Sequence, residues 1–326
     1  MRIAILDDYQ NIVSGLECIQ LLAGHTVDIF TQPWSSRKDM ISQLSSYEAI
    51  VLTRERTILT KEILAELTGL KIISQTGRPG DHVDLKACEE FGKVLLAGNG
   101  SPVAPAELAW SLIMAAQKRL PLYINSMNEG TWQSSQVLFQ NNLSVPRLLK
   151  NNTLGIFGLG KIGSLIASYG KAFEMKVLVW GRDGSKQKAH DMGFEFAKSQ
   201  DDLFERSDIL TLHLRLNKES SGIVNYDNLS KMKKDSIFVN TSRSDLLEKN
   251  ALSQCLENNK GPFLFALDVH SNEPSSTTIL YNHTERILAT PHIGFFEIES
   301  LEMYYRTAFQ NIINFLNGDK SSIYQS

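Results

Sequence analysis

The sequence contains few cysteines and no long apolar run, and both features exclude classes of protein. Its 326 residues include three cysteines, Cys18, Cys88 and Cys255, which are too few and too far apart for a disulfide framework or a Cys-x-x-Cys metal site. No window approaches the roughly 18 consecutive apolar residues that a membrane-spanning helix needs. We therefore expect a soluble protein with reduced thiols, no membrane attachment and no bound metal.

Neither sign of charge is in excess. The 33 Lys and Arg residues face 36 Asp and Glu residues, which gives a formal net charge of −3. Such a balance creates no overall field that would attract nucleic acid or an anionic membrane. The first residues, Met1 to Asp8, enter a strand pattern at once and reach two acids, unlike the long apolar stretch of a secretion signal. The expected location is therefore the cytoplasm.

Short apolar runs alternate with longer helical patterns along the whole chain, which is typical of parallel β-α-β units. The runs are nearly all apolar rather than alternating, as strands are when helices cover both faces of a sheet. We expect strands at residues 2–6, 25–30, 48–53, 71–75 and 93–97 in a first domain, and at 153–157, 176–180, 208–212, 236–240, 263–267 and 287–289 in a second. The predicted fold class is α/β, with two doubly wound parallel sheets.

The order of these patterns predicts that one domain is inserted into the other. Residues 98–102 break the first pattern, and a helix opened by Pro105 crosses into the second domain. No further strand is expected after the amphipathic helix at about 297–316, so we expect this helix to pack on the first domain. Residues 129–150 look like an irregular arm. The expected boundaries are 1–102 with 293–326 for a discontinuous first domain, and 103–292 for the domain inserted into it.

A glycine-rich stretch has the sequence context of a dinucleotide-binding loop. Gly-Leu-Gly-Lys-Ile-Gly at 158–163 follows an expected strand and opens a helix expected from Ser164 to Phe173. The first glycine would permit the tight turn, the second would let a pyrophosphate approach the backbone, and the third would allow the helix to pack closely. The helix N-terminus would bind the anion through its free N–H groups; the alternative is a turn without a ligand. The residues expected to hold the cofactor here are Gly158, Gly160, Lys161, Ile162 and Gly163.

The end of the next strand bears on the choice between NAD and NADP. A NAD enzyme usually places an acid there, about 20 residues after the glycines, to bind the ribose hydroxyls. This chain has Gly181 followed by Arg182, and a guanidinium can grip the 2′-phosphate of NADP where an acid would repel it. NADP is therefore favoured over NAD. Asp183 keeps NAD possible, and a solvated Arg182 at a strand end is the alternative interpretation.

Three further segments each follow a strand of the second domain, at the carboxyl edge where open α/β sheets bind ligands. They are Val239 to Arg243, Ala266 to Pro274 and Thr290 to Gly294. With the glycine loop before them, this ordered set resembles the D-isomer-specific 2-hydroxyacid dehydrogenases. The resemblance implies that 103–292 is a Rossmann dinucleotide-binding domain and that 1–102 with 293–326 is a flavodoxin-like substrate domain. The likeness covers nearly the whole chain, because pieces of the first domain such as Arg54-Glu55-Arg56-Thr57 also look like the family.

The resemblance implies a catalytic set in which Arg243 holds the substrate carboxylate and carbonyl, His292 is the acid and base, and Glu273 orients His292. Charge alone agrees with these roles, because reducing a 2-keto acid puts negative charge on the carbonyl oxygen and needs a fixed cation and a proton donor. A carboxylate beside an imidazole favours the protonated form that can donate. Further expected dinucleotide contacts are Asp268 at the nicotinamide carboxamide, with His213 and Thr241 beside the cofactor.

The substrate is expected between the domains, with its carboxylate also touching a loop of the first domain. Gly77 and Arg78 are the expected contacts, because the family binds carboxylate on the backbone of this loop. Arg54 is a further candidate, and a surface charge is the equally plausible alternative for it. The chain departs from the family at Ser244, where Gly is usual, and at Arg215, where Pro is frequent.

These residues predict an NAD(P)-dependent oxidoreductase that transfers hydride between NAD(P)H and a small 2-keto acid or D-2-hydroxy acid, of the glyoxylate, hydroxypyruvate or phosphohydroxypyruvate class. A dinucleotide-sensing corepressor of the same fold is the alternative, since such proteins can retain the Arg, Glu and His set. Formate dehydrogenase pairs its His with Gln, so Glu273 argues against that enzyme. The resemblance also implies a homodimer, with the arm around Trp132 as a contact.

Overall fold

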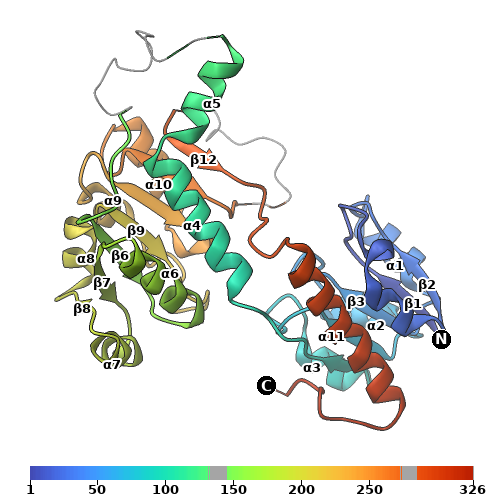
Figure 1. Cartoon of the computed structure of the whole chain (residues 1–326). Helices are drawn as coiled ribbons and strands as arrows, with labels where there is room; N and C mark the ends of the chain where they lie inside the picture. The colour runs from blue at the N-terminus through green and yellow to red at the C-terminus, as the bar shows by residue number, and fades with distance from the viewer. Residues whose placement is uncertain (131, 133–144, 272, 274–284, 326) are drawn as a thin grey trace. The chain divides into compact units, whose positions relative to one another are not determined.

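The computed structural model describes residues 1–130, 132, 145–271, 273 and 285–325. Within these residues the chain forms two compact units. The terminal unit combines Met1–Ser101 with Phe296–Ser326, and the central unit is Pro102–Phe295. Each unit has its own parallel sheet, covered by helices (Figure 1).

The terminal unit is built on a five-stranded sheet with the order β2-β1-β3-β4-β5, which is the order of flavodoxin-like folds. Its described pairings are all parallel, so the carboxyl ends of the strands meet at one edge. In chain order the elements are β1 (Arg2–Ile5), η1 (Val13–Gly15), η2 (Glu17–Leu22), β2 (Thr26–Ile29), α1 (Arg37–Leu44), β3 (Ala49–Leu52), α2 (Lys61–Glu66), β4 (Ile72–Gln75), α3 (Leu85–Glu90), β5 (Val94–Leu96) and α11 (Ile298–Leu316).

Apolar side chains cover both faces of this sheet. On one face, Ile50 and Ile73 pack with buried residues of α1, α2 and α3. On the other face, α11 packs against η2 and β4, and its buried positions recur every three or four residues. Ser74 Oγ donates a hydrogen bond of 2.8 Å to the carbonyl oxygen of Ala308 on this helix. The C-terminal helix therefore returns to the terminal unit, as the sequence predicted.

The central unit is built on a seven-stranded parallel sheet with the order β12-β11-β10-β9-β6-β7-β8. The order reverses between β6 and β9, as in a Rossmann fold, and such sheets bind ligands outside the carboxyl ends of the strands at this point. In chain order the elements are α4 (Val103–Gln117), α5 (Leu120–Asn128), β6 (Thr153–Phe157), α6 (Lys161–Ala172), β7 (Lys176–Trp180), α7 (Asp183–Asp191), β8 (Glu195–Phe196), α8 (Gln200–Arg206), β9 (Ile209–Leu212), α9 (Tyr226–Ser230), β10 (Ile237–Asn240), η3 (Ser244–Leu246), α10 (Ala251–Glu257), β11 (Leu264–Leu267) and β12 (Ile287–Ala289).

The strand residues of the central unit alternate between two cores, one on each face of the sheet. In β6, Leu154 and Ile156 belong to the core that α4 and α6 cover, whereas Phe157 belongs to the core that α8, α9 and α10 cover. Figure 1 shows α4 and α6 on the same face of this sheet. Because both faces are buried, the strands carry apolar side chains at successive positions, which is the pattern that made them recognisable.

The strands expected from the sequence all form, within one residue of the expected bounds. One further strand, β8, was not predicted, because its two residues are too short to give an apolar run. Helix α4 begins at Val103, before Pro105, and α6 begins at Lys161 rather than Ser164, so the last part of the glycine motif is already helical. The expected arm at 129–150 lies mostly outside the described residues.

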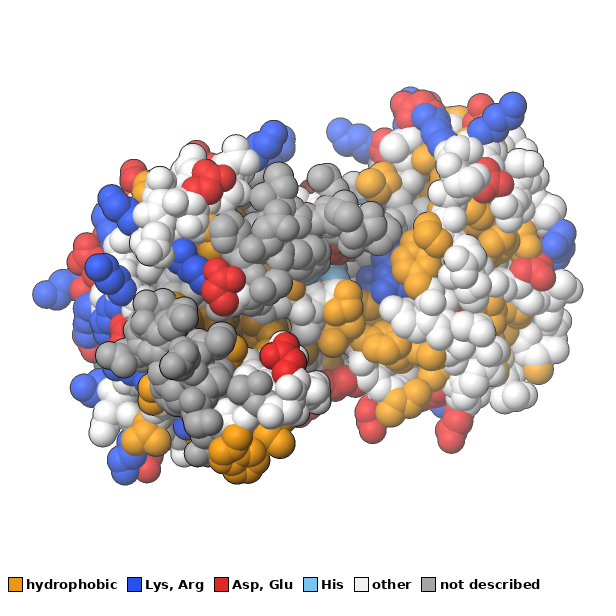
Figure 2. Space-filling model, turned by 90° about the horizontal axis from the view of Figure 1, so that it is seen from above, with side chains coloured by type: hydrophobic (Ala, Val, Ile, Leu, Met, Phe, Trp, Pro, Cys, Tyr) orange, Lys and Arg blue, Asp and Glu red, His pale blue; other side chains and the backbone are white. Residues whose placement is uncertain are grey.

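The surface of the molecule carries mixed charge. Figure 2 shows basic and acidic side chains interspersed over the face in view, which agrees with the near balance of the two signs in the sequence. Within the described ranges, each helix is too short or too polar to cross a membrane.

Candidate active site

The three glycines of the loop after β6 occupy three different environments. Gly158 has a φ of +98°, and a Cβ there would lie 2.6 Å from the carbonyl oxygen of His213. Gly163 packs so closely that a Cβ would lie 2.2 Å from the carbonyl oxygen of Gly158. Gly160 faces open space, since a Cβ there would have no heavy atom of the described chain within 4 Å. The loop is therefore tightly packed at its first and last glycine and open at the middle one.

Helix α6 begins directly after this opening. Its N-cap residue is Gly160, and no side chain of the described structure caps its first turn. The N–H groups of Lys161, Ile162 and Gly163 therefore have no partner within the helix. Together with the helix dipole, such free N–H groups form an anion site. The loop lies between β6 and β9, where the strand order reverses, so these residues fit the pyrophosphate of a dinucleotide.

His213 follows β9 beside the glycine loop. Its Nε2 lies 3.0 Å from Thr211 Oγ1, and its buried Nδ1 has no hydrogen-bond partner in the described chain. Burial lowers the pKa of His213 to about 3, so the ring is neutral at physiological pH. Its main-chain carbonyl is the group that leaves no space for a side chain at Gly158. His213 thus shapes the loop and adds no charge beside a phosphate.

The end of β7 has no space for the acid that a NAD enzyme usually carries. A Cβ at Gly181 would lie 2.7 Å from Ser185 Oγ, which accepts a hydrogen bond of 3.2 Å from the N–H of Leu159. The next residue, Arg182, places Nη2 at 2.9 Å from Glu219 Oε2. These two side chains are 74% and 80% exposed, so their ion pair contributes little and leaves Arg182 easily released to another anion.

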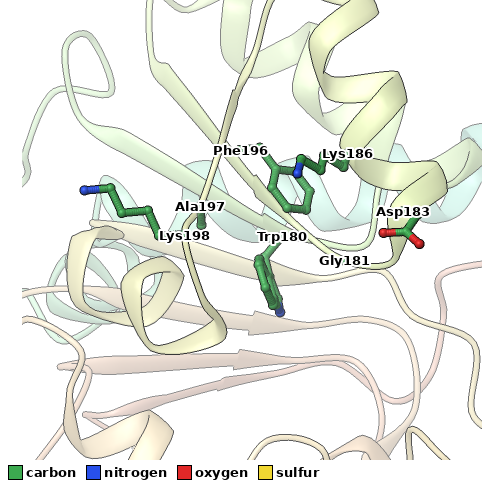
Figure 3. Close-up of a pocket in the computed structure, with 7 residues that line it drawn as sticks. All are labelled: Trp180, Gly181, Asp183, Lys186, Phe196, Ala197 and Lys198. Atoms are coloured by element: carbon green, nitrogen blue, oxygen red, sulfur yellow. The ribbon is translucent and has the colours of Figure 1, made fainter.

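A pocket of about 410 Å³ lies beside Gly181, at the ends of β7 and β8. The Trp180 and Phe196 rings give it apolar surface, with 5.4 Å between their centroids. Figure 3 shows Asp183 and Lys186 coming from α7, with Lys198 extending in the direction opposite to Asp183. The full lining is Trp180, Gly181, Asp183, Lys186, Phe196, Ala197 and Lys198. Two cations against one acid make the pocket suited to an anion.

The residues of the predicted catalytic set follow β10, β11 and β12, which are neighbours in the sheet. Arg243 lies in the turn after β10, two residues after Thr241, and is half-buried. Its Nη1 donates a hydrogen bond of 2.7 Å to the carbonyl oxygen of Ser242, and Asn240 Nδ2 donates one of 2.9 Å to the carbonyl oxygen of Arg243. Ser244 is not among the described non-glycine residues with positive φ, so this departure from the family's Gly fits the turn without backbone strain.

Glu273 and His292 form a hydrogen-bonded pair. His292 Nδ1 contacts Glu273 Oε2, and Glu273 Oε1 accepts a hydrogen bond of 2.7 Å from the N–H of His270. Burial acts to raise the pKa of Glu273, but the hydrogen bond from His292 and its charge outweigh burial and lower that pKa. Glu273 is therefore anionic at neutral pH. In the described chain His292 Nε2 makes no hydrogen bond, so it is the ring nitrogen that can pass a proton to a ligand.

The turn that carries His292 is strained and is held by Asp268. His292 has a φ of +53°, which is unfavourable for a residue with a side chain. Asp268 Oδ1 accepts from Thr290 Oγ1 at 2.6 Å and from the N–H of Ile293 at 2.9 Å, and Oδ2 accepts from the N–H of Gly294 at 2.8 Å. Burial raises the pKa of Asp268, and these bonds offset part of the rise. A lone pair of Oδ2 is left for a ligand, which is compatible with the predicted carboxamide contact.

Two of the predicted substrate residues of the terminal unit lie together at the carboxyl edge of its sheet. Arg54 follows β3 with a φ of +59°, and its N–H donates a hydrogen bond of 2.9 Å to Thr76 Oγ1. Its guanidinium lies 5.4 Å from the ring centroid of Tyr304. A Cβ at Gly77 would lie 2.9 Å from Arg54 Nη1, so the two residues are in contact. Arg78 follows Gly77 and is exposed.

The sequence singled out neither His270 nor Phe295, yet both contact the Glu273–His292 pair. Phe295 presents its ring to His292 at 6.2 Å between centroids and an interplanar angle of 83°. His270 donates a hydrogen bond from its backbone N–H to Glu273. Its position three residues before Glu273 is the only sequence signal that could have indicated this contact.

Comparison with known proteins identifies the family. The profile of the NAD binding domain of D-isomer specific 2-hydroxyacid dehydrogenases matches residues 110–294, which is more than half of the chain. The chain belongs to the D-isomer-specific 2-hydroxyacid dehydrogenase family. The match contains the glycine loop and the Arg, Glu and His set, so this region is the family's NAD-binding domain and the cofactor is a nicotinamide dinucleotide.

Relatives of this D-2-hydroxyacid dehydrogenase support the same assignment. The structure of a putative D-3-phosphoglycerate dehydrogenase oxidoreductase from Ralstonia solanacearum matches with a TM-score of 0.94 and 47% identity, over 99% of this chain and 96% of that chain. The glyoxylate reductase of Thermococcus litoralis is 31% identical over 94% of this chain and 91% of its own. The D-3-phosphoglycerate dehydrogenase of Archaeoglobus fulgidus is 30% identical over 85% of this chain and 51% of its own. The chain thus spans about half the length of the curated phosphoglycerate dehydrogenases it matches.

Proposed function

We propose that this protein transfers hydride between NAD(P)H and a small 2-keto acid, with the D-2-hydroxy acid as the reduced product. The observation that carries the proposal is the contact between Glu273 and His292 at the ends of neighbouring strands, beside the turn that supplies Arg243. Relatives are named glyoxylate reductase, hydroxypyruvate reductase and D-3-phosphoglycerate dehydrogenase. These names support glyoxylate, hydroxypyruvate or phosphohydroxypyruvate as the substrate class.

Each member of the set has a role that its chemistry allows. When bound, the dinucleotide supplies hydride for the keto carbon or accepts it in the reverse reaction. Arg243, which cannot lose its proton, holds the substrate carboxylate and carbonyl oxygen. His292 donates a proton from Nε2 as negative charge develops on that oxygen, and takes one up in the reverse direction. Glu273 holds Nδ1, which orients the imidazole and stabilises its protonated form.

A keto-acid panel with both cofactors tests this activity. Oxidation of NADPH and of NADH would be followed by absorbance with glyoxylate, hydroxypyruvate, phosphohydroxypyruvate and pyruvate. We expect turnover of at least one substrate, loss of at least about 100-fold in His292→Gln, and normal turnover in His190→Gln, a matched variant of an exposed histidine. Tight dinucleotide binding without turnover of any 2-keto acid would contradict the proposal and favour a dinucleotide-sensing binding protein.

We propose further that the cofactor preferred is NADP. Three features support this: the lack of space for an acid at Gly181, the weakly paired guanidinium of Arg182, and the two lysines, Lys186 and Lys198, in the adjoining pocket. The guanidinium and the lysines attract the two negative charges of a 2′-phosphate, and without an acid at Gly181 there is no repulsion from that position. Asp183 opposes binding of the phosphate. The measurement is the ratio of kcat/KM for NADPH and NADH with the best keto acid. A ratio below one would contradict this preference.

We also propose that the protein is a homodimer that pairs through α5. None of the nine residues of α5 is buried in the described structure. Leu120, Ile124 and Met127 are spaced on one face of the helix and are 45%, 56% and 56% exposed, and Trp132 beyond it is 65% exposed. Such an apolar stripe is suited to a second copy of the same surface. The cytoplasmic location stays a prediction.

Light scattering of the purified protein tests the dimer. We expect twice the chain mass of 36.5 kDa for the wild type and a shift toward monomer for Ile124→Glu. The matched control is Ile298→Glu, which changes an isoleucine 60% exposed at the start of α11. A wild-type mass of one chain at micromolar concentration would overturn the proposed pairing.

A further inference from the structure

A second histidine, His270, lies beside the Glu273–His292 pair. It follows β11, and its exposed fraction is 9%. Its Nε2 lies 2.8 Å from the carbonyl oxygen of Thr290. A carbonyl oxygen only accepts hydrogen bonds, so Nε2 carries the proton. The other nitrogen, Nδ1, is buried and has no hydrogen-bond partner in the described chain.

The two contacts of His270 reach the two halves of the Glu273–His292 pair. Its main-chain N–H donates a hydrogen bond of 2.7 Å to Glu273 Oε1, the carboxylate oxygen that does not contact His292. The carbonyl of Thr290 that its ring binds also accepts a hydrogen bond of 3.0 Å from the N–H of His292. His270 therefore connects the carboxylate on one side with the backbone of the catalytic histidine on the other.

This connection lies beyond the last backbone hydrogen bond between β11 and β12. The last described ladder bond between β11 and β12 runs from the N–H of Thr290 to the carbonyl of Leu267, at 2.9 Å. Past this point His292 adopts its left-handed conformation, which persists only where surrounding contacts enforce it. Asp268 holds the residues after His292, and the ring of His270 holds the residue two positions before it. The turn is thus fixed on both sides.

We propose that His270 is a positioning residue for the hydride-transfer reaction: the hydrogen bond from its ring Nε2 to Thr290 and the one from its backbone N–H to Glu273 fix the Thr290–His292 turn beside Glu273. This inference rests on the proposed function, because the turn carries the proton donor. His270 acts through Thr290 and Glu273 and has no contact of its own with the reacting atoms. Of the titratable groups, Glu273 accepts the backbone N–H of His270, and the backbone N–H of His292 shares the carbonyl of Thr290 with the His270 ring.

Substitution of the ring tests the role. His270→Phe keeps an aromatic ring of similar size and removes the donor to Thr290, whereas His270→Gln places an amide N–H close to the position of Nε2. We expect kcat for keto-acid reduction to fall about fivefold to tenfold in His270→Phe, as for the loss of one buried hydrogen bond, and to recover in His270→Gln. The KM for the dinucleotide should stay within about twofold of wild type, because the glycine loop is not altered. His190→Phe, at an exposed position, is the control.

The pH profile separates positioning from general destabilisation. If the turn loosens, the imidazolium of His292 loses part of its contact with Glu273, and the alkaline limit of reduction should move to lower pH in His270→Phe but not in His190→Phe. Equal losses of kcat in the Phe and Gln variants, or an unchanged pH limit in both, would overturn the proposal.

A measurement on the wild type does not depend on turnover or on the folding of a variant. With ¹⁵N-labelled histidine, long-range ¹H–¹⁵N NMR spectra report which ring nitrogen carries the proton. We expect Nε2 of His270 to carry a proton, because it donates to the carbonyl oxygen of Thr290. An Nε2 without a proton would overturn the proposal even in an active enzyme. If Nε2 carries the proton but the protein reduces no 2-keto acid, the proposed function is refuted. The hydrogen-bond arrangement around His270 is then supported.

Discussion

Replacing Glu273 by Gln tests the central contact of the site. Gln has the same shape. With its amide oxygen accepting the N–H of His270, its NH2 group faces His292 Nδ1, so the change removes both the negative charge and the acceptor beside His292. The side chains of Glu273 and His292 are 31% and 34% exposed, so their contact is partly shielded from water. A charge-assisted hydrogen bond in such a place contributes about 1.5–3 kcal/mol. We therefore expect kcat/KM for keto-acid reduction to fall between about tenfold and about 150-fold.

The assay is steady-state oxidation of NADPH over a range of pH, with dinucleotide affinity measured separately by fluorescence titration. The alkaline limit of reduction should move to lower pH in Glu273→Gln, because the protonated His292 loses its anionic partner. Dinucleotide affinity should not change. Glu174→Gln is the matched control, since Glu174 is 66% exposed and paired with Lys150 at the surface. A Glu273→Gln variant with unchanged kcat/KM and an unchanged pH profile would refute the reasoning.

Further predictions concern the anchors of substrate and cofactor. Arg243→Ala should lower kcat/KM at least about 100-fold, because the cation for the substrate carboxylate is lost, while the dinucleotide Kd changes little; normal turnover would contradict its role. Arg182→Ala should raise KM for NADPH about tenfold and hardly alter that for NADH, and equal effects on both would remove the case for a 2′-phosphate contact. Gly160→Ala should weaken both dinucleotides at least about tenfold with an unchanged Tm, because its Cβ fills only the open space of the loop. Gly163→Ala should lower Tm as well, since its Cβ would clash with a backbone carbonyl; normal dinucleotide binding by Gly160→Ala would place the pyrophosphate elsewhere. The pKa of Glu273 is lowered in the folded state, so the contact of its carboxylate with His292 stabilises the protein above the ordinary carboxyl pKa. This stabilisation is lost as the pH falls through the lowered pKa. Tm should therefore decline more steeply at acid pH in the wild type than in Glu273→Gln.

The strands were predictable because the fold buries both faces of each sheet. Residues such as Leu154, Ile156 and Phe157 are apolar in succession, and a successive run of this kind stands out in a sequence. Strand β8 has two residues at the edge of its sheet, where a long run is not required. The segment between β1 and β2 forms 3₁₀ helices, and the carboxylate of Asp8 accepts the N–H groups of Ile12 and Val13 there. Side-chain to backbone bonds of this kind leave no periodic signal in a sequence.

The strand ends that carry the candidate site were predictable, and the contacts around its residues were not. Arg243, Glu273 and His292 follow consecutive strands, so strand order alone brings them to one edge of the sheet. The space at Gly181 depends on Ser185, and the partner of Arg182 lies 37 residues away in the sequence, at Glu219. Neither contact follows from a motif, because each depends on how loops pack after the strands are in place.

The order of the central sheet separates the residues proposed to select the cofactor from those proposed to carry the chemistry. Arg182 and the pocket lie at the ends of β7 and β8, the glycine loop follows β6, and Arg243, Glu273 and His292 follow β10 to β12 at the other end of the sheet. A dinucleotide with its pyrophosphate on the glycine loop would therefore place its adenosine half toward Arg182 and its nicotinamide half toward His292. A contact to the 2′-phosphate is the same in the ground state and in the transition state, and such binding alters KM without altering kcat. Arg182→Ala should accordingly leave kcat at saturating NADPH within about twofold of wild type, and a large fall in kcat would show that this end of the sheet is coupled to the hydride-transfer step.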